Sequence, residues 1–212
     1  MFSAAEMDAL VSAAPYLWWR AFIELSAATG LRVQEALCLH ATDICERTLS
    51  VRITSDPVDG FGEAEVLTLR RKLPLHHERV VEVPSSVMRT LLQLRSERPN
   101  DTHVFVPNWK LSQLWLLIDT GSVITTHDIC PSISSCFRMI QRRARLELAR
   151  TRDVPLAEVA WQERPLASLR VTAAARLAEH LCPSALASRL GCAGPASVSS
   201  ILSHIQTTRG AA

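Results

Sequence analysis

Apolar positions recur at helical spacing near the start of the chain. Ser3 followed three residues later by Glu6 forms a capping box, the usual start of a helix, and apolar residues follow at helical spacing. The segment after Pro15, YLWWRAFIELSAA, predicts a second helix that ends at Gly30. A short amphipathic helix is predicted to begin near Val33.

The pattern then changes from helical spacing to short runs rich in β-branched residues. These runs cover residues 49–54, 65–69 and 79–83, and turn residues such as SDPVDGFG separate them. Three short strands joined by turns predict a small antiparallel sheet.

Helical spacing returns after Pro84. We expect a helix over residues 85–97 and a long helix that starts near Pro131 and runs to Arg150. Three more helices are predicted over 166–181, 183–190 and 195–205. The fold class is therefore mainly α with a small three-stranded antiparallel sheet, and residues 1–212 show no internal domain boundary.

Composition excludes several classes of protein. Apolar residues make up 48% of the 212 positions, which is enough for a real core. No apolar run is long enough to span a bilayer, and the N-terminal residues lack the pattern of a signal peptide, so we expect a cytoplasmic protein. Cys38, His40 and Cys45 fit no standard zinc spacing, and we expect neither a metal nor a cofactor.

The positive charge is almost entirely arginine. The formal net charge is only +2, but 21 of the 23 basic residues are Arg. Arg138, Arg142 and Arg145 share one face of the predicted long helix and are a candidate DNA-contact surface. The alternative is a solvated helix face in which Glu147 partly offsets the charge.

Two arginines stand among small or apolar neighbours. Arg32 follows the turn at Gly30, and Arg170 lies in the segment ASLRVTAAARL. Such a charge usually has a partner. An internal ion pair, for example with Glu35, would satisfy one of these arginines, whereas an external phosphate would satisfy both.

Several segments, in this order, resemble the catalytic domain of the tyrosine recombinases, the phage-integrase superfamily. They are TGLRVQEALCLHATDI (29–44), LRRKLPLHHERVVEVP (69–84), ASLRVTAAARL (167–177), LGC (190–192) and LSH (202–204). The resemblance runs from Phe2 to about Ile205. It implies that Arg32, Lys72 (or Arg71 in its place) and Arg170 hold a phosphate of double-stranded DNA.

The departures from the family pattern concern catalysis. The resemblance places Ala167, Val171 and Cys192 where active members carry histidines (or a tryptophan at the last position), and Leu202 where they carry the nucleophilic tyrosine. The only tyrosine in the sequence is Tyr16. Loss of a nucleophile usually ends covalent catalysis, so we expect a protein without strand-cleaving activity.

The resemblance therefore predicts a DNA-binding regulator or accessory factor, of a mobile genetic element, without the family's N-terminal DNA-binding domain. Its partners would be DNA and either itself or an active recombinase. One alternative is an interaction protein that modulates an active recombinase. Another is an active recombinase with a different nucleophile, for which Ser199, Ser200 or Ser203 are candidates with His204 as the base.

Overall fold

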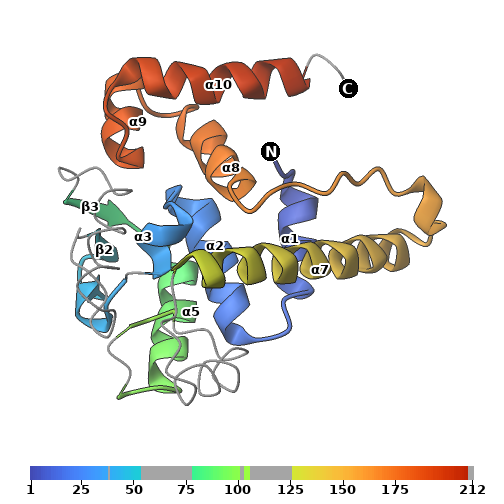
Figure 1. Ribbon diagram of the computed structural model, residues 1–212, viewed down its shortest axis with the longest axis horizontal. Helices are drawn as coiled ribbons and strands as arrows, with labels where there is room; N and C mark the ends of the chain where they lie inside the picture. Colours follow the sequence, from blue (N-terminus) through green and yellow to red (C-terminus); the bar gives the residue numbers. More distant parts are fainter. Residues whose placement is uncertain (38, 54–77, 101–102, 106–125, 210–212) are drawn as a thin grey trace.

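The computed structural model describes residues 1–37, 39–53, 78–100, 103–105 and 126–209. Helices form most of this part of the chain, with a small sheet at one side (Figure 1). The helices are α1 (Ala4–Ser12), α2 (Leu17–Thr29), α3 (Val33–Leu37), α5 (Ser85–Ser96), α7 (Thr126–Arg152), α8 (Ser168–Leu177), α9 (Pro183–Leu190) and α10 (Pro195–Arg209), with short 3-10 helices η1 (Ala41–Asp43) and η2 (Leu156–Glu158). The predicted fold class is confirmed.

The ends of the first two helices follow the sequence signals. At the start of α1, the Glu6 backbone N–H donates to Ser3 Oγ at 3.2 Å, and the Ser3 N–H donates to Glu6 Oε2 at 2.7 Å. Helix α2 ends at Gly30, whose φ of +72° is left-handed. A Cβ at Gly30 would also lie too close to the end of the buried Leu190 side chain, which would have to shift.

The main core is built around α2. Trp18 stacks on Phe22 with ring centroids 5.3 Å apart, and Phe105 meets Phe22 edge-on at 5.4 Å. These three side chains are almost completely buried, and each such burial contributes about 1.5–3 kcal/mol. Helix α2 packs against α1, α5 and α8, so it is the central support of the domain.

Within the described residues, the sheet has three antiparallel strands in the order β1 (Ile44–Cys45), β2 (Ser50–Ile53) and β3 (Arg79–Glu82). Val51 of β2 lies opposite both Ile44 and Val81. The predicted strands at 49–54 and 79–83 correspond to β2 and β3, whereas the predicted strand at 65–69 lies outside the described residues. The hydrophobic pattern by itself did not predict β1, because two residues are too short to show an alternating pattern.

Helix α7 begins at Thr126, earlier than the start predicted near Pro131. Its inner side is an apolar stripe that includes Ile133, Phe137 and Ala144. Gln141 is fully buried on the same side, where its Nε2 donates to the Arg164 carbonyl and its Oε1 accepts from the Arg164 N–H, both at 2.8 Å. This amide fixes the chain segment that leads into α8.

The last three helices form a second apolar cluster, made of Ala174, Leu186, Ala187, Leu190 and Val198. Helix α10 lies along the top of the molecule in Figure 1 and packs on α8 and α9. The predicted helix at 183–190 matches α9, while α8 ends before the predicted residue 181 and α10 continues past residue 205. Leu190 joins this cluster to the end of α2, because it packs against Gly30.

Candidate functional site

Arg32 lies between the end of α2 and the start of α3. Its backbone N–H donates to Glu35 Oε2 at 2.7 Å, so Glu35 caps the first turn of α3. In the side chain, Nη2 donates to the carbonyl of Gly191 at 3.0 Å, and Nη1 lies 3.6 Å from Glu35 Oε1. The side chain remains 31% exposed and is therefore accessible to a ligand.

Arg170 reaches the same place from α8. Its Nη1 donates to the carbonyl of Gly30 at 2.6 Å, and its Nη2 donates to the carbonyl of Leu190 at 2.8 Å. Leu190 and Gly191 are consecutive, so Arg32 and Arg170 converge on neighbouring carbonyls at the end of α9. We use the name arginine cluster for the group formed by Arg32, Arg170, Arg79 of β3, Glu35 and these carbonyls.

Arg170 is partly withdrawn from solvent and has Arg32 as a positively charged neighbour. Burial lowers the pKa of Arg170 from its ordinary value, and the nearby charge of Arg32 lowers that pKa further, while Cys192 and Glu35 act in the opposite direction. Two positive charges brought to the same place repel each other. An anion placed between them would relieve this repulsion.

Arg79, at the start of β3, is a third guanidinium in the cluster, and sequence reasoning missed it. It holds Glu35 in a two-bond fork, with Nη1 donating to Oε1 at 3.0 Å and Nη2 donating to Oε2 at 2.9 Å. Its Nε donates to the carbonyl of Arg189 at 3.2 Å. A Cβ on Gly191 would lie 2.6 Å from Arg79 Nη1, so a glycine there lets the guanidinium approach.

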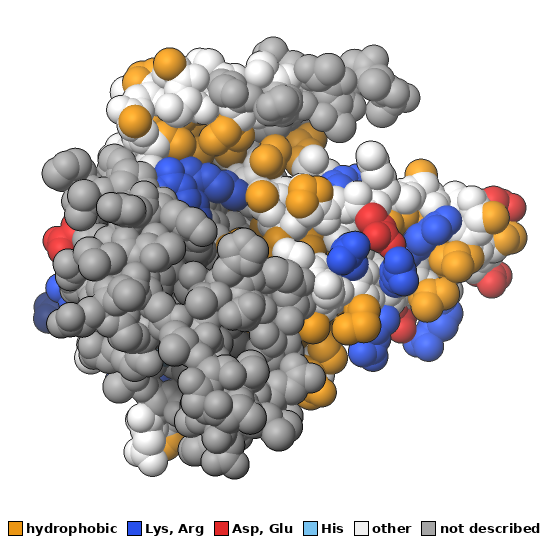
Figure 2. Space-filling view, in the orientation of Figure 1, with side chains coloured by type: hydrophobic (Ala, Val, Ile, Leu, Met, Phe, Trp, Pro, Cys, Tyr) orange, Lys and Arg blue, Asp and Glu red, His pale blue; other side chains and the backbone are white. Residues whose placement is uncertain are grey.

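The charges of the arginine cluster do not balance. Among the residues that the structure describes, the three guanidinium groups share one carboxylate, that of Glu35, and their other hydrogen-bond partners are mainly neutral carbonyls. A carbonyl satisfies an N–H group without cancelling the charge. The cluster therefore keeps an excess of positive charge, and Figure 2 shows basic side chains gathered on this face near α8 and α9.

Three of the substituted positions lie close to Arg170. Cys192 places its sulfur 3.3 Å from Arg170 Nη2. Ala167 is exposed at the N-terminal end of α8, and Val171 is the residue that follows Arg170 in that helix. Alanine and valine side chains carry no group that transfers a proton.

Leu202 lies in α10 and packs against the apolar cluster of α8 and α9. Ser199 donates its hydroxyl to the carbonyl of Pro195 at 3.1 Å, one turn back in the same helix. The side chains of Ser200 and His204 are outside the described residues, and Lys72 and Arg71 lie outside them altogether.

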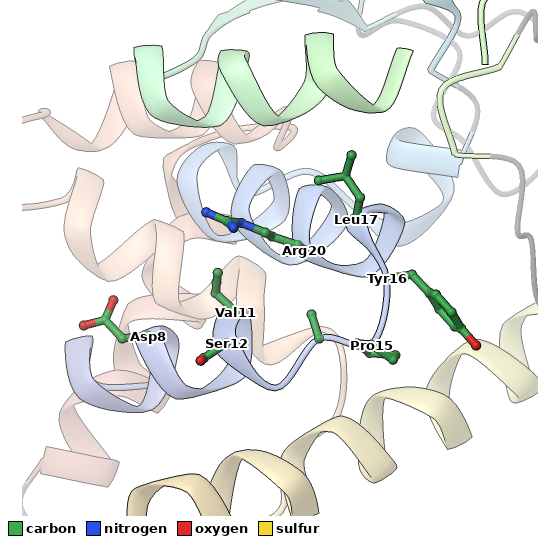
Figure 3. Close-up of a pocket in the computed structure, with 8 residues that line it drawn as sticks. Asp8, Val11, Ser12, Pro15, Tyr16, Leu17 and Arg20 are labelled. Carbon is green, nitrogen blue, oxygen red and sulfur yellow. The ribbon is translucent and has the colours of Figure 1, made fainter. Parts of the chain in front are cut away.

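Tyr16 lies far from the arginine cluster. It precedes the first turn of α2, whereas Gly30 and Arg32 follow its last turn. The helix has 13 residues, which separate its ends by about 20 Å. Tyr16 is 58% exposed at the edge of a cavity of about 530 Å³ between α1 and α2, and Figure 3 shows its ring pointing away from Arg20.

The predicted stripe on α7 has partners of its own. Arg142 Nε donates to Glu163 Oε1 at 2.9 Å, Arg145 Nη2 donates to the Leu156 carbonyl at 2.8 Å, and Arg138 Nη2 donates to Ser135 Oγ at 3.3 Å. Arg138 and Arg142 remain exposed. Their contact with DNA stays a prediction.

A smaller cavity of about 370 Å³ borders the arginine cluster. Arg79 and Cys192 line it, together with Ser184 and Ser188 of α9. Within the described residues, no group of three His, Cys, Asp or Glu side chains is arranged to hold a metal ion. The His40 ring instead contacts the His103 ring, with centroids 4.3 Å apart and ring planes inclined by 49°. No helix in the described part of the chain is long and apolar enough to cross a membrane.

The fold is similar to those of several solved recombinase and integrase structures. XerA recombinase matches with a TM-score of 0.60 and 17% identity over 98% of this chain. The integrase of transposon Tn1549, in complex with transposon right-end DNA, matches with a TM-score of 0.62 and 14% identity over 100% of the chain. A lambda integrase dimer bound to a core site matches with a TM-score of 0.58 and 13% identity over 94% of the chain.

The fold is that of a tyrosine-recombinase catalytic domain. The chain spans 62% of the XerA recombinase chain, 66% of the Tn1549 integrase chain and 47% of the lambda integrase chain. No protein-family model matches the sequence, and a comparison with the curated proteins also finds no match. The tyrosine-recombinase fold thus explains why segments as distant as Arg32 and Arg170 meet.

Proposed function

We propose that this protein binds double-stranded DNA by holding a backbone phosphate at Arg32 and Arg170, without cleaving the strand. The observation that carries the proposal is the convergence of these two side chains on the adjacent carbonyls of Leu190 and Gly191. The excess positive charge of the arginine cluster supports an anionic ligand. Guanidinium groups suit phosphate because their planar N–H groups bond two oxygens at once.

The absence of cleavage rests on the chemistry of the substituted positions. Strand cleavage in this fold class needs a nucleophile beside the phosphate, yet Leu202 is an apolar side chain packed in a hydrophobic cluster. The only tyrosine, Tyr16, lies at the other end of α2. A protein that grips DNA without cutting it would act as a regulator or accessory factor, and the likeness to a transposon integrase supports a mobile genetic element as its setting.

Two assays on the same duplex test the proposal. In an electrophoretic mobility shift, the wild-type chain retards the duplex, and retardation weakens as salt rises. In a suicide-substrate assay with a nicked duplex, no covalent protein–DNA adduct forms. An adduct would disprove the loss of cleavage, and an unretarded duplex at low salt would disprove DNA binding.

The runner-up is an interaction protein that binds an active recombinase and modulates it. The observation in its favour is the presence of large exposed apolar side chains on α7. The same mobility shift separates this function from the first, because an interaction protein of this kind would not retard DNA by itself.

A further inference from the structure

The outer side of α7 carries two large apolar side chains that are exposed to solvent. Met139 is 58% exposed and Leu146 is 53% exposed. They are seven residues apart, so they lie on one side of the helix about 10 Å from each other along its axis. Each follows a buried core residue, Phe137 or Ala144, by two positions, which turns it toward solvent.

Arginines surround this apolar pair. Arg142 and Arg143 lie between Met139 and Leu146, and Arg138 and Arg150 flank them, all four exposed. Six arginines occur between residues 138 and 152, against a single acidic residue, Glu147. Figure 2 shows apolar and basic side chains mixed along this arm of the molecule. We call Arg138, Met139, Arg142, Arg143, Leu146 and Arg150 the outer face of α7.

We propose that the outer face of α7 docks an acidic amphipathic helix of a partner protein. Met139 and Leu146 repeat one position of a heptad, so a second helix that lies along α7 would contact both side chains. The surrounding guanidinium groups complement carboxylates on the flanks of that helix. A DNA backbone would use the arginines but would leave Met139 and Leu146 without an apolar partner.

This surface is separate from the arginine cluster. Helix α7 runs away from the sheet and from α3, and its C-terminal half lies at the far end of the molecule (Figure 1). The arginine pairs on this half are weak, because Arg142 and Glu163 are 72% and 43% exposed and Arg150 lies 3.9 Å from Glu147. Carboxylates of a partner can therefore replace them.

The test uses two synthetic helical peptides with leucine at positions a and d of each heptad. One carries glutamate at the flanking positions and the other carries lysine. Fluorescence anisotropy with the full chain measures the binding of each peptide. The variant Met139→Glu/Leu146→Glu is compared with Val80→Glu, which changes an apolar side chain that is 63% exposed on β3.

The proposal expects the acidic peptide to bind and the basic peptide not to bind. The double variant should bind the acidic peptide at least about tenfold more weakly, while Val80→Glu should bind it as the wild type does. Circular dichroism melting must show that both variants are folded, and single variants replace the double variant if it is not.

Three kinds of result overturn the proposal. The first is failure of the peptide assay, in which either neither peptide binds or the double variant binds the acidic peptide normally. The second is that the double variant loses retardation of a DNA duplex, which would make the outer face a DNA surface. The third is a wild-type dimer in sedimentation that dissociates in the double variant, which would make a second copy the occupant. DNA binding through Arg32 and Arg170 is measured in a separate assay, so its failure can be told apart from a failure of peptide docking on the outer face of α7.

Discussion

Arg79 and Glu35 form a two-bond ion pair in which the side chains are only 9% and 4% exposed. The pair connects β3 to α3, and Glu35 in turn caps the turn that carries Arg32. Arg79 is thereby linked through Glu35 to the turn that carries Arg32. It also contacts the Arg189 carbonyl, so one side chain joins the sheet, α3 and α9.

Replacing Arg79 should destabilise the protein strongly. Arg79→Ala leaves the Glu35 carboxylate buried without its main partner, and breaking such a pair costs about 3–5 kcal/mol. Chemical denaturation measures the loss, and Arg89→Ala, which removes an exposed arginine on α5, is the control and should change stability by less than about 0.5 kcal/mol. Equal losses in both variants would contradict the role given to Arg79.

Gly30→Ala should be costly for two reasons. The left-handed φ of +72° opposes any side chain by about 1–2 kcal/mol, and the new methyl group would also collide with Leu190. We expect a loss of more than about 2 kcal/mol and weaker DNA binding, because the Gly30 carbonyl holds Arg170.

Gly194→Ala is the matched control for this substitution. A Cβ at Gly194 meets nothing within 4 Å, and no left-handed φ is recorded there. The melting temperature should therefore stay close to that of the wild type. A Gly30→Ala variant as stable as the wild type would show that the turn relaxes more easily than its geometry indicates.

Cys182 should react with thiol reagents at a lower pH than an ordinary cysteine. Hydrogen bonds from the Ser184 side chain and from the backbone of the first turn of α9 lower the pKa of Cys182. A lower pKa means more thiolate at neutral pH, so the half-maximal rate of alkylation by iodoacetamide shifts to lower pH. Mass spectrometry of the labelled peptide follows the Cys182 thiol alone. The variant Ser184→Ala should shift the pH of half-maximal alkylation back to a higher value.

Restoring the family's catalytic side chains tests whether the arginine cluster still positions a phosphate for strand cleavage. Leu202→Tyr by itself should give no covalent adduct with a nicked suicide duplex, since Ala167 and Cys192 supply no histidine. The combined variant Leu202→Tyr/Ala167→His/Cys192→His should form an adduct that denaturing electrophoresis detects. No adduct from a folded triple variant would mean that the site no longer positions a phosphate beside α10.

The sequence predicted those features that depend on local chemistry. The capping box at Ser3, the helix end at Gly30 and the strand at Arg79 all carry signals within a few residues. The short strand β1 was missed, because two residues form a strand only when β2 lies beside them. The early start of α7 was not predicted either, because a proline favours the first turn of a helix, whereas α7 continues on the N-terminal side of Pro131.

The composition of the arginine cluster was only half predictable. Arg32 and Arg170 stood out because charged side chains among apolar neighbours need partners. Arg79 did not stand out, because its role depends on Glu35, 44 residues away, and on Arg189, 110 residues away. The part played by the carbonyls of Gly30, Leu190 and Gly191 cannot be predicted from the sequence, since every residue has a backbone carbonyl.

The most direct test of the central claim is the salt dependence of DNA binding. Fluorescence anisotropy with a labelled duplex compares the wild type with Arg32→Ala/Arg170→Ala and with the control Arg20→Ala/Arg89→Ala, which removes the same charge from exposed arginines elsewhere. We predict that the first variant binds at least about tenfold more weakly, with a salt slope smaller by about one, while the control stays close to the wild type. Equal affinity in all three proteins, or an equal loss in both variants, would contradict a phosphate grip at Arg32 and Arg170.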